Sequence, residues 1–131
     1  TGTASLDFVA LTPERSEIRV ANRRPVQNHI KGVHAAAMSL LAETATGMVV
    51  GMNVRDDCLP LCKSLQVNFR KRATGGLVAK AHLTAAQRQA MANETKGEVT
   101  VAVTVTDEAG IEPIECEFVW AWVPKEKKPQ A

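Results

Sequence analysis

Apolar and polar side chains alternate along most of the second half of the chain, which is the pattern of β-strands with one buried face. Four such stretches lie between residues 64 and 122, and turns such as Thr74-Gly75-Gly76 separate them. Two shorter alternating stretches, Ser5–Leu11 and Glu14–Asn22, come near the start. The pattern predicts six strands, with a polar connection at Ala85–Thr95 that has room for a helical turn.

One long helix is predicted between the two groups of strands. The segment His34–Gly51 is rich in Ala, Met and Leu, and Gly47 and Gly51 weaken its end. It is apolar around most of its circumference, so we expect other elements to enclose it. The flanking segments Asn22–Gly32 and Arg55–Pro60 are predicted to be loops.

The predicted order of elements is therefore β-β-α-β-β-β-β. A buried helix followed by a four-strand meander indicates an α+β fold in which one antiparallel sheet wraps around a long central helix, as in the hotdog fold. One sheet and one helix leave a sheet edge and a helix flank uncovered, so a homodimer or a dimer of dimers is expected. We expect a single domain over residues 1–123 and a polar tail over residues 124–131.

Composition and charge narrow the functional classes. The 131 residues hold 16 Lys and Arg against 14 Asp and Glu, a net charge of +2, and 4% aromatic residues with no Tyr. This balance disfavours a nucleic-acid partner, which needs a concentrated basic face or a stacking platform. The apolar segment Val33–Val54 carries Glu43 near its middle, which favours a buried helix over a membrane span. The start lacks a secretory signal, so cytoplasm is the expected compartment.

Cysteine usage gives no sign of a metal site or a disulfide framework. The three cysteines, Cys58, Cys62 and Cys116, lack a second pair, and the histidines lack ligand spacing. No phosphate loop, dinucleotide fingerprint or nucleophile elbow is present. We therefore expect no metal and no cofactor.

Glu43 is the single formal charge between Lys31 and Arg55. Burying an unpaired carboxylate costs several kcal/mol, so a sequence seldom places one in an apolar helix without compensation. Two interpretations are open. The carboxylate has a structural role, capping a loop or pairing with a surface Arg of a neighbouring strand, or it does chemistry as a nucleophile or as a base for water.

Asn28, His34 and Ala35 lie at the predicted start of the helix. Amides in the first turn of a helix lack intrahelical partners and can hold a developing oxyanion, and Asn28 could add a side-chain donor. Ala35 and Glu43 are eight residues apart, roughly 12 Å along the axis, so they cannot both reach one carbonyl carbon within one chain. Two antiparallel helices of a dimer would bring them together, with the site between subunits.

The stretch from Asn28 through Gly32 to His34-Ala35-Ala36, with Glu43 nine residues after His34, resembles the hotdog acyl-CoA thioesterases. The phenylacetic-acid-pathway and 4-hydroxybenzoyl-CoA types are the most similar. Their pattern is Asn or Gln, five residues, His-Gly-Gly, and an acid nine residues after the His. Here Ala35-Ala36 replaces Gly-Gly, and the added methyls hinder close approach of an acyl group to the backbone.

The resemblance implies roles for these residues. Glu43 would activate water or attack the thioester, Asn28 and the Ala35 amide would polarise the carbonyl, and His34 would shape that loop. A hydroxyl residue on the next strand positions water in some members, and Cys62 or Ser64 is near that place. A CoA thioester also needs cations for its phosphates. The candidates are Lys31, Arg88 and the cluster Arg70-Lys71-Arg72, although such a cluster is more often a solvated strand end. Gly32 is a further candidate for contact with the substrate.

Hydrolysis of acyl-CoA thioesters is thus the predicted function. One alternative is a hotdog module that binds acyl-CoA without turnover, which Ala35-Ala36 makes plausible. Another is a hydroxyacyl thioester dehydratase or hydratase, because His29 precedes Glu43 by fourteen residues, although the accompanying Phe-Pro-Gly-His-Phe-Pro stretch is missing.

Overall fold

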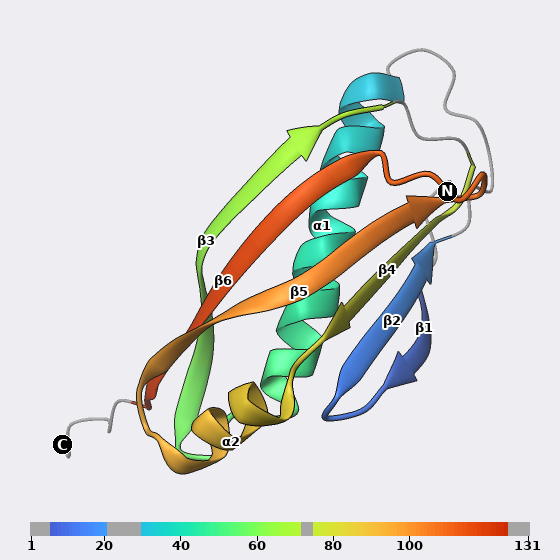
Figure 1. Ribbon diagram of the computed structural model, residues 1–131. Helices are drawn as coiled ribbons and strands as arrows, with labels where there is room; N and C mark the ends of the chain where they lie inside the picture. Colours follow the sequence, from blue (N-terminus) through green and yellow to red (C-terminus); the bar gives the residue numbers. More distant parts are fainter. Residues whose placement is uncertain (1–5, 21–29, 72–74, 126–131) are drawn as a thin grey trace, which may run out of the picture.

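The computed structural model describes residues 6–20, 30–71 and 75–125 of the chain. Two helices and six strands follow one another (Figure 1). Their bounds are β1 (Leu6–Leu11), β2 (Arg15–Val20), α1 (Ile30–Gly51), β3 (Cys58–Phe69), β4 (Leu77–His82), α2 (Ala85–Asn93), β5 (Gly97–Asp107) and β6 (Ile114–Pro124).

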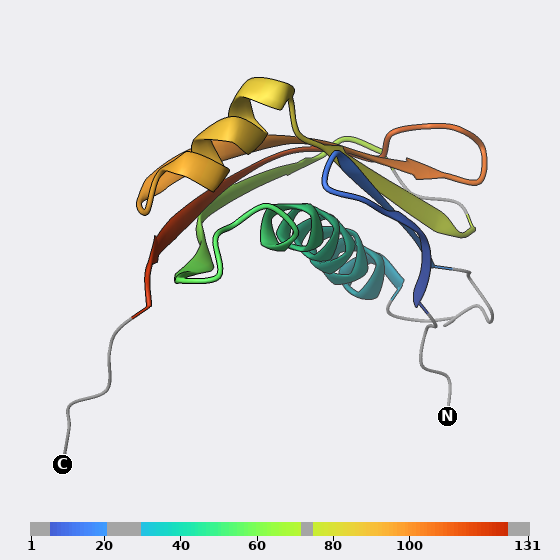
Figure 2. The same ribbon diagram turned by 90° about the horizontal axis from the view of Figure 1, so that it is seen from below.

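All six strands form one antiparallel sheet in the order β1-β2-β4-β5-β6-β3. The sheet curves around α1, and α2 lies on the opposite face (Figure 2). The predicted α+β class, with a sheet wrapped around a long helix, is confirmed. The predicted four-strand meander is wrong, because β2 occupies the place beside β4 and β3 pairs with β6 at the far edge.

The second helix is longer than the single turn for which the sequence left room. Its start is fixed by a capping box, in which the Thr84 hydroxyl accepts from the Gln87 amide and the Gln87 side chain accepts from the Thr84 amide. Nine residues, Ala85–Asn93, are helical as a result. The observed order is therefore β-β-α-β-β-α-β-β.

Two other boundaries differ from the prediction. Helix α1 begins at Ile30, inside the segment predicted to be a loop. Strand β3 begins at Cys58 and includes Pro60, where a loop was predicted. Proline is tolerated there because β3 is an edge strand with a single neighbour, so one side of its backbone needs no ladder partner.

The sheet covers α1 on one side. The buried side chains of the helix recur at helical spacing and pack on the inner face of the sheet. They are Met38, Leu41, Ala42, Ala45, Thr46, Val49 and Val50. Leu40, on the opposite side of the helix, is 60% exposed. The expectation of a fully enclosed helix is therefore wrong for the single chain.

Ser16 joins β2 to the middle of α1. Its buried hydroxyl donates to the carbonyl oxygen of Ala45 over 2.7 Å. Replacing Ser16 with Ala removes this bond in a water-free site, so we expect the free energy of unfolding to fall by about 1–2 kcal/mol. Urea denaturation measures the change. The matched control is Ser64→Ala at an exposed position of β3, and an equal loss in both variants would contradict this account.

Candidate active site

Glu43 lies partly buried on the flank of α1 that faces β6 and β3. Thr46 and Gly47 are one turn further along the same flank, and both contact Trp120 of β6. Among the described residues, no Lys or Arg forms an ion pair with Glu43. The interpretation of Glu43 as half of a structural ion pair therefore has no support in the described part of the chain.

Cys62 of β3 lies close to Glu43. The pKa of the Cys62 thiol is raised, first by burial and second by the negative charge of the Glu43 carboxylate. Cys62 is paired across the strands with Trp120, so carboxylate, thiol and indole belong to one cluster. The fold thus brings together two residues that are 19 positions apart in the sequence.

Ser64 is not part of this cluster. The register between β3 and β6 shifts between Cys62 and Ser64, so that Lys63 is an extra residue. The bulge places Ser64 opposite Val119, exposed on the outer face, while Cys62 keeps its place opposite Trp120. Of the two residues predicted to position water, Cys62 lies on the side of the sheet that carries Glu43, and Ser64 does not.

A thiolate nucleophile is disfavoured. Burial raises the pKa of Cys58 and Cys62, and it raises the pKa of Cys116 to about 11. Thiols with such pKa values are almost wholly protonated at neutral pH, and the thiolate is the reactive form. The cysteines are free, and Glu43 is the group of the cluster that is suited to accept a proton.

The inner face of β3 continues from Cys62 toward the start of α1 as an apolar strip. We call Leu65, Val67 and Phe69 the β3 strip. Leu65 and Phe69 are 50% and 54% exposed, although both lie on the side of the sheet that carries α1. The strip is therefore an apolar surface open to a ligand or to a second chain.

Cations follow the β3 strip at the end of the strand. Arg70 and Lys71 are exposed there, and Arg70 Nη2 pairs with Glu115 Oε1 over 2.6 Å. Arg72 lies outside the described residues. Arg88 is on α2, across the sheet from the strip, and pairs with Glu14. Because Glu115 lies on the outer face of the sheet, its ion pair draws Arg70 away from the face that carries Glu43. Lys71 follows at the strand end, and Arg88 lies on the far side of the sheet.

The predicted donors lie at the beginning of α1. Asn28 and His29 are outside the described residues, and of Lys31, Gly32, His34 and Ala35 the helical backbone is described. Because α1 begins at Ile30, Ala35 lies in its second turn, where an amide bonds to the carbonyl four residues earlier. The amides without intrahelical partners are those up to about Gly32. The placement of the Ala35 amide among the free amides is therefore wrong for this structure.

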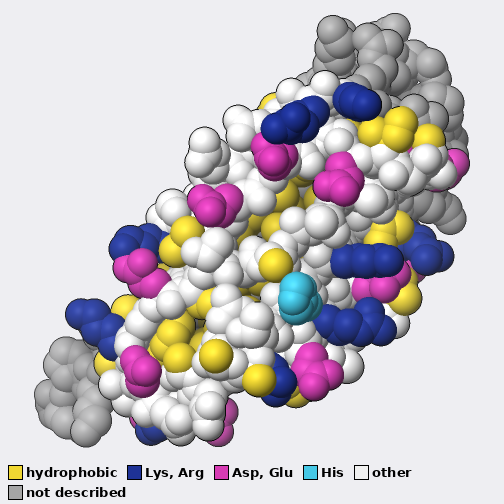
Figure 3. Space-filling view, in the orientation of Figure 1, with side chains coloured by type: hydrophobic (Ala, Val, Ile, Leu, Met, Phe, Trp, Pro, Cys, Tyr) yellow, Lys and Arg dark blue, Asp and Glu magenta, His cyan; other side chains and the backbone are white. Residues whose placement is uncertain are grey.

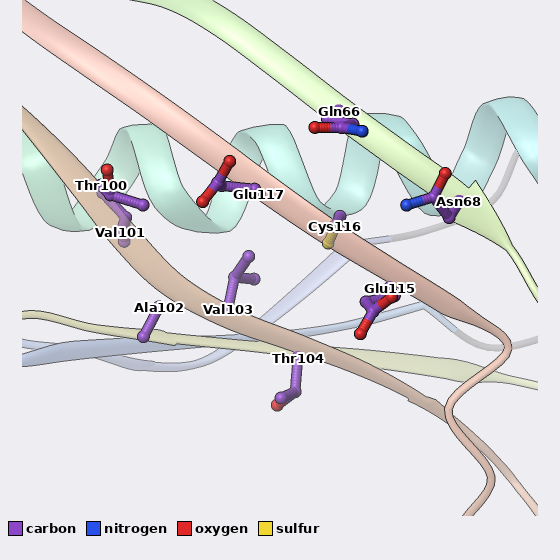
Figure 4. Close-up of a pocket in the computed structure, with 10 residues that line it drawn as sticks. All are labelled: Gln66, Asn68, Thr100, Val101, Ala102, Val103, Thr104, Glu115, Cys116 and Glu117. Atoms are coloured by element: carbon purple, nitrogen blue, oxygen red, sulfur yellow. The ribbon is translucent and has the colours of Figure 1, made fainter.

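A hollow of about 460 Å³ lies on the outer face of the sheet, away from Glu43 (Figure 4). Gln66, Asn68, Glu115 and Glu117 line it together with the outward threonines of β5. The space-filling view shows an open, mixed-charge surface there (Figure 3). It lacks the apolar enclosure of a small-molecule site.

No group of three His, Cys, Asp or Glu among the described residues is arranged to hold a metal ion. No helix in that part of the chain is long and apolar enough to cross a membrane.

Residues 1–123 match the family model described as a domain of unknown function, DUF4442. The chain belongs to this family. No curated protein matches the DUF4442 chain in sequence. Solved structures match it in fold, and they include several that are described as thioesterases.

One such structure is a Pseudomonas aeruginosa protein of unknown function described as a probable thioesterase, with a TM-score of 0.78, 23% identity, and coverage of 92% of this chain and 83% of that chain. A thioesterase enzyme from Staphylococcus aureus has a TM-score of 0.71, 14% identity and coverage of 91% and 93%. A thioesterase from Haemophilus influenzae has a TM-score of 0.65, 12% identity and coverage of 91% and 78%. The resemblance to the hotdog thioesterase superfamily is thus confirmed for the fold.

Sequence reasoning missed three residues of the cluster. Thr46 and Gly47 stood inside the predicted helix, and Trp120 stood in an alternating strand. A small residue one turn after the lone acid was a possible signal. That signal identifies Trp120 as the neighbour of the small residue only once the position of β6 relative to α1 is known.

The electrostatic interaction between the Glu43 carboxylate and the Cys62 thiol can be tested without any substrate. Replacing Glu43 with Gln removes the negative charge that opposes thiolate formation, so the pKa of Cys62 should fall while remaining above its usual range because burial persists. The rate of Cys62 alkylation at a fixed pH should then rise. Mass spectrometry of the Cys62 peptide across a pH series measures this shift.

Glu98→Gln is the matched control, because Glu98 is exposed on β5 and pairs with Lys63. An unchanged Cys62 titration in Glu43→Gln, or an equal change in both variants, would contradict the placement of Glu43 beside the thiol.

Proposed function

We propose that this DUF4442 chain hydrolyses acyl-CoA thioesters at a site shared by two copies of the chain. The observation that carries the proposal is the position of Glu43. It is partly buried, has no cationic partner among the described residues, and faces a thiol at one end of an exposed apolar strip. A carboxylate beside an apolar surface suits an acyl substrate and an attacking water.

In the proposed reaction, Glu43 takes a proton from water as the water oxygen attacks the thioester carbonyl carbon. The tetrahedral intermediate then collapses, the carbon–sulfur bond breaks, and the sulfur leaves as a thiol after receiving that proton. Direct attack by the Glu43 carboxylate, with hydrolysis of the resulting anhydride, is the other route open to the same residue. The neutral Cys62 thiol helps to position the water.

The oxyanion donors must come from another chain. Glu43 is eleven residues after Gly32, roughly 16 Å along the helix, so free amides at the start of α1 cannot reach a carbonyl carbon held by Glu43 of the same chain. We propose that the partner contributes the start of its α1, with Asn28 and the first-turn amides near Gly32 as donors. His34 and Ala35 shape this segment.

A dimer of this kind fits the surfaces that the single chain leaves uncovered. The edge strand β3 has an unpaired side, and the β3 strip and Leu40 are exposed beside it. A twofold axis perpendicular to β3 at that edge would set two copies of α1 antiparallel and make the β3 strip a surface shared by the two chains. We also propose that residues 1–123 form a single domain. Two dimers can pair further into a dimer of dimers in this proposal, and the expected compartment is the cytoplasm.

The Staphylococcus aureus thioesterase adds a parallel. Its structure was solved with a glutamine replaced by alanine at position 32 and with a glutamate replaced by alanine at position 47, fifteen positions apart. Asn28 and Glu43 are separated by the same number of positions. The amide and acid pair is therefore the first place to look for catalysis in this chain.

The second candidate is an acyl-CoA-binding module without turnover. The early start of α1 at Ile30 favours it, because the Ala35 amide is used inside the helix and Ala35-Ala36 adds two methyls at the oxyanion segment. Lys71 would serve either function by meeting the CoA phosphates, and Arg70 would first have to leave its ion pair with Glu115.

The Glu43→Gln variant separates the two functions. Loss of the carboxylate should lower kcat for thiol release from acyl-CoA by about 10²–10⁴-fold, because a positioned general base contributes that much, while the melting temperature stays nearly unchanged. A thiol-reactive dye measures the release, with Glu117→Gln on the outer face as control.

Equal turnover in the wild type and Glu43→Gln would refute the role of Glu43. If the wild type binds acyl-CoA but releases no thiol from acetyl-, octanoyl- or benzoyl-CoA, the binding module is the correct function.

A further inference from the structure

The Trp120 indole is fixed against α1 on the C-terminal side of Glu43. Its Nε1 donates to Thr46 Oγ1 over 2.8 Å, and the Thr46 hydroxyl donates to the carbonyl oxygens of Ala42 and Glu43, each 3.0 Å away. The bond reaches into a buried part of the helix, since Thr46 is fully buried. The ring is therefore held by the same turn of the helix that carries Glu43.

Gly47 lets the ring come this close. A Cβ atom at position 47 would lie 2.9 Å from Cζ2 and Cη2 of Trp120, closer than such atoms approach in proteins. The glycine inside the helix costs roughly 1 kcal/mol relative to alanine. This destabilising glycine lies at the position where the Trp120 indole packs on the helix.

The surroundings of Glu43 consequently differ on its two sides along the helix. On the C-terminal side of the carboxylate, the Trp120 ring spans from Gly47 on α1 to β6, with Cys62 of β3 next to it. On the other side the β3 strip stays exposed in the single chain and leads to the exposed Lys71 just after the strand. An acyl-CoA has the same arrangement, because its acyl group at one end is apolar and its nucleotide at the other end carries negatively charged phosphates.

We propose that Trp120 is the closed end of the acyl site and limits the length of the acyl group. The inference rests on the proposed function and names the substrate class. The acyl group points from Glu43 toward Trp120, and the pantetheine arm runs along the β3 strip toward Lys71. Glu43 and Gly47 are four residues apart, about 6 Å along the helix axis, which is the length of an acyl chain of about four carbons.

The test compares two tryptophans of the same strand. Trp120→Leu shortens the proposed wall and keeps an apolar side chain. Trp122→Leu is the matched control, because the Trp122 indole also donates one hydrogen bond, to Glu94 O over 2.8 Å, and packs on a glycine, Gly97. Trp122 is buried in the core, so its loss should reduce stability without lengthening the acyl site.

The measurement is kcat/KM over a series of straight-chain acyl-CoAs from acetyl to dodecanoyl, with melting temperatures recorded in parallel. We expect the wild type to prefer butanoyl over octanoyl. Trp120→Leu should raise the octanoyl-to-butanoyl ratio by about tenfold or more, the scale of a few methylenes in a pocket, and Trp122→Leu should leave it within about twofold.

Thiol release by the wild type with an unchanged ratio in Trp120→Leu would overturn this inference and leave the proposed function standing. If the wild type releases no thiol, the proposed function fails, and calorimetric binding of nonhydrolysable acyl-CoA thioethers decides the inference. In that case, the role of Trp120 as the closed end of the site would be supported if the octanoyl thioether binds more tightly to Trp120→Leu but not to Trp122→Leu. Equal chain-length dependence in all three proteins, or no binding, would refute it.

Discussion

The contact between α1 and β6 sets the position of everything else at the site. Trp120 reaches the helix only because position 47 is glycine and because the Thr46 hydroxyl accepts its N–H. That contact fixes the rotation of α1 under the sheet, and with it the flank on which Glu43 lies. The cross-strand pair of Cys62 and Trp120 then brings β3 to the same place.

A single curved sheet can cover only one side of the helix that it wraps. Leu40, Leu65 and Phe69 remain exposed as a result, and they surround the flank that carries the acid. The same geometry that places a carboxylate beside an apolar surface leaves the helix start of the same chain too far away to assist it. Both features favour a second copy of the chain as the missing half of the proposed site.

Much of the fold could be predicted from local pattern. Period-two alternation located the strands, and an uninterrupted apolar stretch located α1. The spacing of Thr84 and Gln87 is that of a capping box and could have predicted the start of α2. The polar composition of the segment that follows favoured a loop instead. Pro60 suggested a loop, and only the place of β3 at the sheet edge explains why it lies in a strand.

The site was predictable in part, because Glu43 stands alone as a charge in its helix. The choice between Cys62 and Ser64 was beyond the sequence, since one extra residue at the bulge decides which of them faces inward. The start of α1 was equally hidden, because Ile30 continues the helix into a segment that has no clear period. These details depend on tertiary contacts rather than on local preference.

The most direct test of the shared site is complementation between two inactive variants. Glu43→Gln and Asn28→Ala chains are mixed, unfolded and refolded together, and thiol release is compared with that of each variant alone. Half of the random dimers would be mixed, and each mixed dimer would rebuild one intact site out of two, so the mixture should recover about a quarter of wild-type activity. A mixture no more active than its separate components, while the wild type survives the same refolding, would contradict a site built from two chains.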